Sequence, residues 1–188
     1  MQDTRTIFFV GKPGCGKGTQ VELLAKRTGW LTFASGQMFR AIAAEDTPVG
    51  RKVQVENYAG VLQPHWFAMY IYLKSLFSIT EGASAIFDGF NRKVPEAELI
   101  VDSLKWLERP FSILYLNISD DEARKRLALR KKVSGREDDN FVEERLAEYK
   151  KFTEPAIEIF RKAGALIEIN GEQTPEKIAE DIRAALAV

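Results

Sequence analysis

The sequence has very few of the residues that build disulfide frameworks and transition-metal sites. Among 188 residues there is one cysteine, Cys15, which excludes an intrachain disulfide and a zinc site made of several cysteines. The one histidine, His65, excludes a histidine-rich metal site and argues against a Ser-His-Asp triad. Long hydrophobic runs are also missing, because the longest one, residues 66–73, is far short of the roughly 20 residues that cross a bilayer.

Neither sign of charge is in excess. Lysine and arginine together number 27, and so do aspartate and glutamate, so the formal net charge is zero. A general nucleic-acid binder carries a basic excess, so we expect no nucleic-acid partner, and the short apolar runs predict no membrane partner. The amino-terminal apolar stretch follows Asp3 and stops at Lys12, unlike a secretory signal. With the lone cysteine, these features predict a cytoplasmic protein, and we expect it to be a monomer.

The sequence does contain a regular alternation of short apolar runs and longer amphipathic segments. Five runs have the β-branched and aromatic composition of buried strands: residues 6–10, 31–34, 84–87, 111–118 and 165–169. Helices are predicted over 17–28, 37–45, 51–60, 95–108, 120–132, 141–163 and 174–186 and after Pro64, and Pro155 predicts a kink or break in the longest of them. This alternation is typical of βαβ units, so we expect an α/β fold with a doubly wound parallel sheet in a single domain, 1–188.

A glycine-rich segment, GKPGCGKGTQ at residues 11–20, stands between the first predicted strand and a predicted helix. Its glycines let backbone N–H groups approach phosphate oxygens closely, and the N-terminus of the helix favours the same anion. Lys17 can reach the outer phosphates, and Gly18 stands where a serine or threonine usually follows that lysine, so magnesium is expected to be held through water. The glycine spacing differs from the G-x-G-x-x-G dinucleotide pattern. The loop residues predicted to bind ATP are Gly14, Cys15, Gly16, Lys17, Gly18 and Thr19.

This loop is similar to that of the adenylate kinase family, which reads GxPGxGKGTQ. The sequence FASGQMFR at 33–40 is similar to the family's S-T/A-G-D-M/L-L-R, and DGFNR at 88–92 is similar to D-G-F-P-R. Residues 134–155 follow the family's lid and post-lid pattern, with a lid as short as in its short-lid members. The resemblance covers nearly the whole chain and implies a P-loop NTPase fold and a nucleoside monophosphate (NMP) kinase, which transfers the γ-phosphoryl group of Mg·ATP reversibly to AMP. It also implies an NMP-binding segment at about 35–64 and a lid at about 130–139.

The resemblance assigns roles to charged residues at strand ends and in the basic helix. Asp88 ends an apolar strand, where an acid can orient magnesium-bound water. The planar fork of arginine suits phosphate, and residues 124–136 carry seven basic side chains and no acid, as phosphoryl transfer requires. The implied catalytic set is Lys17, Arg92, Arg126, Arg130, Arg136 and Arg145, and Arg126, Arg130 and Gln173 would also bind ATP. The acceptor nucleotide would be bound by Ser35, Gly36, Arg40, Val61, Leu62, Gln63, Gly89, Arg92, Glu96, Arg136 and Arg145.

The chain departs from the family pattern mainly where the acceptor base would bind. Glu96 stands at the place of the family's adenine-reading glutamine, Gln63 at that of a valine, and Asn91 at that of a proline. Ionised glutamate only accepts hydrogen bonds, so it can take adenine's amino hydrogen but suits guanine's pair of N–H groups better. Glu96 is equally interpreted as a first-turn carboxylate favoured by the helix dipole. The stretch 136–145 is also shorter than in the family, which would shift Arg145 relative to the phosphates.

Two alternatives to AMP phosphorylation therefore stay open. The first is the same reaction with a pyrimidine or guanine nucleotide as acceptor. The second is a nucleotide-binding switch or assembly factor that uses the fold without productive transfer. A pure binder has no need of a second phosphate site, so the presence of Arg92 together with Lys17 and the basic helix favours an enzyme.

Overall fold

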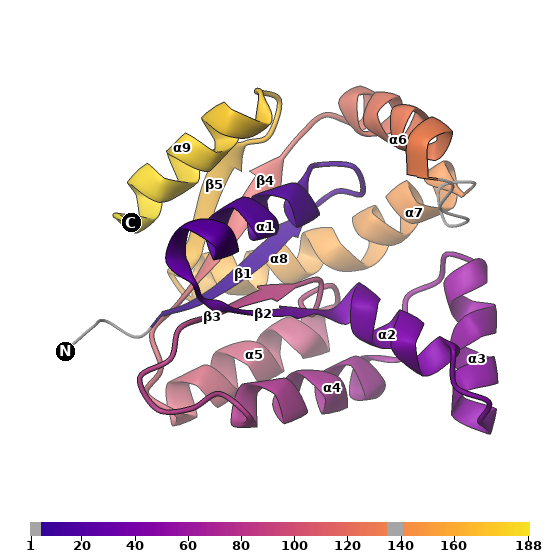
Figure 1. The fold of residues 1–188 in the computed structure, drawn as a ribbon, viewed down its shortest axis with the longest axis horizontal. Helices are drawn as coiled ribbons and strands as arrows, with labels where there is room; N and C mark the ends of the chain where they lie inside the picture. Colours follow the sequence, from indigo (N-terminus) through magenta and orange to yellow (C-terminus); the bar gives the residue numbers. More distant parts are fainter. Residues whose placement is uncertain (1–4, 135–140) are drawn as a thin grey trace.

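The computed structural model describes residues 5–134 and 141–188, and within them the chain forms five parallel strands in the order β2-β3-β1-β4-β5 (Figure 1). The strands are β1 (Thr6–Gly11), β2 (Leu31–Ala34), β3 (Ala85–Asp88), β4 (Phe111–Asn117) and β5 (Leu166–Asn170). Each lies within one residue of a run that the sequence predicts as a buried strand, but the edge strands β2 and β5 are largely exposed or half-buried, unlike β1 and β3. The predicted doubly wound α/β fold is confirmed, with β1 at the centre between β3 and β4.

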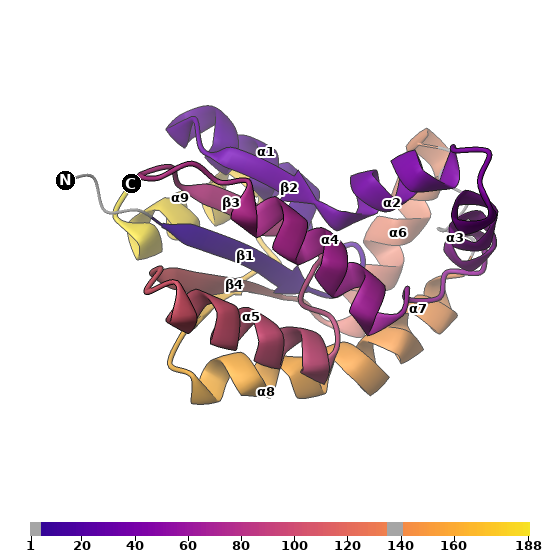
Figure 2. The ribbon, with the colours of Figure 1, turned by 90° about the horizontal axis from the view of Figure 1, so that it is seen from below.

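Helices connect the strands and cover both faces of the sheet. They are α1 (Lys17–Thr28), α2 (Ser35–Ala43), α3 (Pro48–Tyr58), α4 (His65–Phe77), α5 (Val94–Trp106), α6 (Asp120–Ser134), α7 (Val142–Glu148), α8 (Glu154–Lys162) and α9 (Pro175–Leu186). Figure 2 shows α1 on one side of the sheet and α4, α5 and α8 on the other. Both views place α2, α3, α6 and α7 beyond the carboxyl ends of the strands. Over the described residues, no helix combines the length and the apolar character needed to span a membrane.

Side chains alternate along β1 and so divide the core into two parts. Ile7 and Phe9 pack with residues of α1 and α9, whereas Phe8 and Val10 pack with residues of α4, α5 and α8. Phe8 stacks on Phe87 of β3, with the ring centroids 4.9 Å apart. Burying one side chain of this size stabilises a fold by about 1.5–3 kcal/mol. The central strands are therefore fixed on both faces, and so are the loops that leave their carboxyl ends.

Two helices begin earlier than predicted. The helix expected over 37–45 begins at Ser35, and the helix expected over 51–60 begins at Pro48. Thr47 caps the second of these, because its Oγ1 accepts a hydrogen bond from the N–H of Gly50 at 2.9 Å. Proline is well suited to the first helical position, where its missing N–H has no partner in any case.

The long helix predicted over 141–163, with a kink or break at Pro155, is interrupted by a π turn just before this proline. Helix α7 continues through this π turn, η2 (Tyr149–Thr153), into α8, whose first turn holds Pro155. The N–H of Glu154 donates to the carbonyl of Tyr149, five residues back. A proline ring collides with the carbonyl four residues before it, and the wider π turn is how this helix accommodates the ring.

Candidate active site

The carboxyl ends of β1, β2 and β3 open into a cavity of about 1470 Å³. This volume exceeds the roughly 300–1,000 Å³ of an ordinary small-molecule site, so the cavity has room for two ligands. The predicted site residues that line it are Gly14, Cys15, Gly16, Lys17, Gly18, Thr19, Ser35, Gly36, Arg40, Val61, Leu62, Gln63, Asp88, Gly89, Arg92, Glu96, Arg126, Arg130, Arg145 and Gln173. Arg136 and the rest of the second half of the predicted lid, residues 135–139, lie outside the described residues. The structure thus brings together every predicted site residue that it describes.

The glycine-rich loop presents backbone donors to one end of this cavity. Gly14 has φ 82° and Gly16 has φ 94°, conformations in which a side chain would be strained. Helix α1 begins directly after the loop, and within the described residues no side chain caps its N-terminus. The N–H groups of its first turn therefore remain available, and an anion such as a phosphate is the ligand that this arrangement favours.

The side chain of Lys17 is folded back over the same loop. Its Nζ donates to the carbonyl of Gly11 at 2.7 Å and to that of Lys12 at 3.0 Å, and it lies 3.4 Å from the Sγ of Cys15. Cys15 is fully buried, so its thiol packs inside the loop. The ammonium of Lys17 is thus held at the mouth of the phosphate cradle, where phosphate oxygens can replace the two carbonyls.

A cluster of three charges, which the sequence did not reveal, anchors the base of the loop. The Nζ of Lys12 lies 2.7 Å from Oδ1 of Asp120, and the Nζ of Lys150 lies 2.6 Å from Oδ2 of the same carboxylate. Hydrogen bonds from both lysines hold the pKa of Asp120 down at about 2. These residues come from the loop, the start of α6 and the π turn, so only the folded chain brings them together.

A second cationic region lies at the end of β3. Gly89 has φ 82°, and a Cβ there would lie 2.6 Å from Oγ of Ser35 and 2.8 Å from Nη2 of Arg92. Glycine is therefore required for these two side chains to meet over the strand end. The Nε of Arg92 donates to the carbonyl of Gly89 at 3.0 Å. Arg40 lies on α2, and its Nη1 is only 3.3 Å from a Cβ built on Gly36. Two guanidinium groups thus line the cavity beside the phosphate loop.

Glu96 lies in the first turn of α5, where its Oε2 accepts hydrogen bonds from the N–H groups of Arg92 at 2.8 Å and Lys93 at 3.0 Å. The side chain is 3% exposed, and burial raises its pKa to about 7, against the two hydrogen bonds and the nearby positive charges of Arg92 and Lys93. Glu96 is thus a first-turn carboxylate that also lines the cavity. Gln63, in the predicted NMP-binding segment, is also buried, and its Nε2 donates to Oδ1 of Asn57 at 3.3 Å.

Ion pairs hold two arginines of the basic helix α6 in place. Arg126 donates to Oε1 of Glu122 at 2.6 Å while it lines the cavity, and Arg124 joins α6 to α7 through a two-pronged contact with Glu143, at 2.8 and 3.1 Å. The chain leaving α3 meets α7 as well, because a Cβ on Gly60 would lie 3.8 Å from Cγ of Arg145. Arg145 therefore lines the cavity in spite of the shortened stretch before it.

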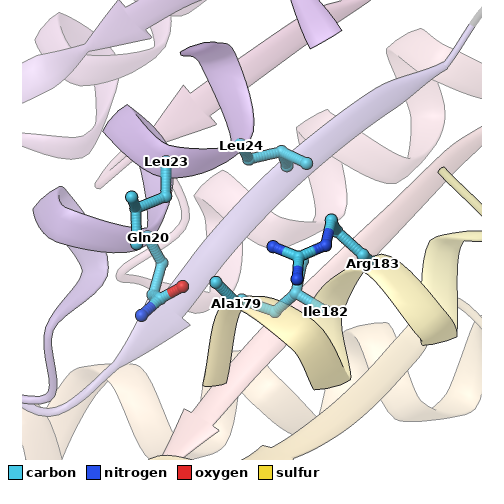
Figure 3. Close-up of a pocket in the computed structure, with 6 residues that line it drawn as sticks. All are labelled: Gln20, Leu23, Leu24, Ala179, Ile182 and Arg183. Carbon is cyan, nitrogen blue, oxygen red and sulfur yellow. The ribbon is translucent and has the colours of Figure 1, made fainter. Parts of the chain in front are cut away.

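The far end of the cavity lies between α1 and α9. Gln173 lines it and donates to Oδ2 of Asp181 at 2.7 Å, and the Nε2 of Gln20 donates to the carbonyl of Pro175 at 2.9 Å. A separate pocket between the two helices, about 10 Å³ in volume, is shown in Figure 3 with Gln20, Leu24 and Ile182 on its walls. Such a pocket has room for one water at most, so it is a packing gap and not a ligand site.

Some cavity residues have no predicted role in the site. Asn57, Glu148, Tyr149 and Thr153 line the cavity. Tyr149 and Thr153 lie in the segment that resembles the family's post-lid pattern, whereas no local pattern marks Asn57 and Glu148. Asn91 also lines it, and here the departure from the family's proline was a visible signal.

The parallel sheet, the glycine-rich loop before α1 and the cationic region at the end of β3 define a P-loop kinase fold in which the loop and the cationic region line one cavity. A family model described as "Adenylate kinase" matches residues 9–165. The chain is similar to the adenylate kinase of Thermus thermophilus, with 31% identity over 98% of both chains. It is also similar to those of a Synechococcus species, with 35% identity over 96% of this chain and 98% of the relative, and of Bacteroides fragilis, with 34% over 96% and 97%. The chain belongs to the adenylate kinase family.

Proposed function

We propose that the protein transfers the γ-phosphoryl group of Mg·ATP reversibly to AMP. The observation that carries this proposal is one cavity lined both by the loop before α1 and by the arginines near the end of β3. A donor and an acceptor held side by side need no covalent intermediate on the enzyme. The adenylate kinase relatives, which match the chain along nearly its full length, support AMP as the acceptor.

The residues of the cavity fit a magnesium ion that is held mainly by nucleotide and water. Asp88 offers an oxygen ligand at the end of β3, and among the described residues no group of three acidic, histidine or cysteine side chains could form a complete metal cage. Magnesium in nucleotide sites commonly keeps several waters and takes few protein ligands. We propose that Asp88 orients such waters, and Mg²⁺ bound with ATP would neutralise part of the phosphate charge.

In this proposal the chain supplies positioning and positive charge. The N–H groups of residues 14–19 hold the donor phosphates, and the ammonium of Lys17 stabilises the negative charge on the phosphoryl group being transferred. Arg40 and Arg92 orient the acceptor so that its phosphate oxygen attacks the γ-phosphorus while the bond to the β-phosphate oxygen breaks and ADP leaves. Arg126, Arg130, Arg136 and Arg145 stabilise the charge on the transferred group, and Gln173 borders the donor base.

The proposal divides the chain functionally into an NMP-binding segment at 35–64, which contains α2 and α3, and a lid at 130–139. Closing both over the substrates would exclude water and suppress ATP hydrolysis. We also propose that the protein acts as a cytoplasmic monomer. Light scattering coupled to size-exclusion chromatography, with and without nucleotide, tests the oligomeric state.

The decisive experiment measures initial rates of nucleoside diphosphate formation from Mg·ATP with AMP, CMP, UMP, GMP or dTMP as the acceptor. A dominant rate with AMP supports the proposal. A higher rate with another acceptor would leave the proposed phosphoryl transfer standing, and Glu96 and Gln63 would then be the residues expected to recognise that base. Slow ATP hydrolysis that no acceptor stimulates would overturn the kinase proposal and favour a nucleotide-binding switch.

A further inference from the structure

Lys93 lies at the junction of three segments around the acceptor side of the cavity. It directly precedes α5, and its Nζ donates to the backbone carbonyl of Gln63 at 2.9 Å. The same Nζ lies 5.3 Å from the centre of the Phe152 ring in the π turn, a distance at which a cation is attracted to the ring face. One ammonium therefore contacts the loop before α4 and the π turn from a position at the start of α5.

Among the described residues, the loop that Lys93 holds has a few other hydrogen bonds: the N–H of Val61 donates to the carbonyl of Glu56 at 3.2 Å, Nε2 of Gln63 donates to Oδ1 of Asn57 at 3.3 Å, and the carbonyl of Pro64 accepts from the first turn of α4. Residues 61–64 belong to no helix or strand, although they carry three of the predicted acceptor contacts, Val61, Leu62 and Gln63. Val61 is 49% exposed, whereas Gln63 is 6% exposed, so the loop turns inward at the residue whose carbonyl Lys93 binds. A loop with few backbone hydrogen bonds moves easily unless side chains fix it. The hydrogen bond from Lys93 is charge-assisted and is the stronger for it.

The segment on the other side of Lys93 carries the second unusual residue of the acceptor site. The backbone N–H of Lys93 donates to Oε2 of Glu96, as does that of Arg92, so the position of this carboxylate depends in part on the same residue. The two places where the chain departs most clearly from the family's base pocket, Gln63 and Glu96, are thus joined by Lys93, which itself lies just outside the DGFNR motif.

We infer that Lys93 is a positioning residue for the acceptor base: its ammonium fixes the loop of Gln63 relative to Glu96 and thereby sets the discrimination between nucleobases. This inference rests on the proposed function. Lys93 acts on the acceptor base and not on the reacting phosphates, because its contacts are with Gln63, Phe152 and Glu96 and not with the loop of Lys17. Its loss is therefore expected to change acceptor affinity and selectivity, and to leave the transfer step intact.

The test compares Lys93→Met with a matched control. The methionine keeps an unbranched apolar stem of similar length but removes the ammonium. Lys151→Met is the control, because the Nζ of Lys151 lies 4.9 Å from the centre of the same Phe152 ring, on an exposed side chain, and its loss leaves the bond to Gln63 in place. Lys93→Arg restores a cation with several donors, so it is expected to recover most of the wild-type behaviour.

We expect Lys93→Met to raise the KM for AMP about tenfold, within the range for losing a hydrogen bond to a charged group. The kcat at saturating AMP and the KM for ATP should stay within about twofold of the wild type. The ratio of kcat/KM for AMP to that for CMP, UMP and GMP should fall by about the same tenfold. Lys151→Met should resemble the wild type in all of these measurements.

Other results would overturn the inference. It is wrong if Lys93→Met and Lys151→Met have the same KM for AMP, if only kcat falls, or if the KM rises equally for all four acceptors. A wild-type protein that phosphorylates no acceptor would instead remove the proposed function itself, so the two failures are distinguishable. Thermal unfolding of each variant checks the fold, and Lys93→Gln, a milder loss with the same expected direction, replaces Lys93→Met if the latter does not fold.

Discussion

The two halves of the cavity are built in different ways. At the half proposed to bind the donor, here called the donor half, the glycine-rich loop and the first turn of α1 offer backbone N–H groups, and one side chain, Lys17, covers them. The half proposed to bind the acceptor, here called the acceptor half, is lined by side chains of α2, the loop before α4, the end of β3 and α5. A backbone site tolerates changes between its glycines, whereas a side-chain site changes its specificity with each substitution. This contrast explains why the chain keeps the family's loop but departs from it around Glu96.

The two halves also differ in how they are held. The donor loop is tied to α6 and the π turn by Lys12, Asp120 and Lys150, an ion-pair cluster that lies outside the acceptor region. The acceptor half depends on single hydrogen bonds, such as that from Lys93 to Gln63 and those to Glu96. We therefore expect substitutions at the donor half to abolish transfer, and those at the acceptor half to change affinity and selectivity.

The largest effect is expected from Lys17→Met, which tests the donor half directly. Removing one charged group that stabilises a transition state costs about 10²–10³ in turnover, so kcat should fall at least a hundredfold. Lys26→Met is the control, because Lys26 is exposed in the last turn of the same helix. A normal kcat for Lys17→Met in the coupled assay with AMP would show that the ammonium does not stabilise the transferred phosphoryl group. The only role left to Lys17 would then be its hydrogen bonds to the loop carbonyls.

The donor half was also the more predictable half. The motif at 11–20 fixed its conformation locally, because glycines with positive φ and a helix start directly after them are properties of the sequence itself. The central strands were equally predictable, since buried parallel strands are continuous apolar runs, whereas the exposure of the edge strands β2 and β5 was not predicted. The π turn was not, because a proline in a helical pattern predicts a disturbance without its form. Neither was the bond from Lys93 to Gln63, which joins residues 30 positions apart.

The next largest effect concerns the pH dependence of stability through Glu96. Its pKa is raised to about 7 in the folded protein, so between pH about 4.5 and 7 the folded state binds more protons than the unfolded state. The stabilisation that Glu96 gives to the folded state is fully present below that window and is lost as the pH rises through it. A shift of this size corresponds to at most about 3 kcal/mol. Glu96→Gln should therefore become more stable relative to the wild type as the pH rises from 4.5 to 8.

Urea unfolding at a series of pH values measures this difference, and Glu98→Gln is its control, because Glu98 is exposed on the same helix. A constant difference between wild type and Glu96→Gln across the window would show that the hydrogen bonds from residues 92 and 93 keep the carboxylate ionised. The acceptor half would then carry a permanent negative charge.

A smaller effect, on the acceptor half alone, is expected from Arg92→Ala. Loss of the fork should lower kcat/KM for AMP at least about tenfold, or 1.4 kcal/mol, while ATP binding changes little. Isothermal titration with ATP separates the two halves, and Arg161→Ala, an exposed arginine of α8, is the control. Equal losses of ATP and AMP affinity would contradict the division of the cavity into a donor and an acceptor half.

The smallest effect is expected at Asn91. This side chain lines the acceptor half and has an amide N–H group without a hydrogen-bond acceptor among the described residues, so it tests whether such a group serves the bound acceptor. Asn91 is 1% exposed, and its Nδ2 meets no acceptor in the part of the chain that the structure describes. An unsatisfied buried N–H costs about 1–3 kcal/mol, so its removal should not destabilise the nucleotide-free protein. If bound acceptor satisfies this donor, Asn91→Ala should raise the KM for AMP about threefold with an unchanged Tm. A lowered Tm with an unchanged KM would show that Asn91 serves packing, and that the selectivity of the acceptor half belongs to Gln63, Lys93 and Glu96.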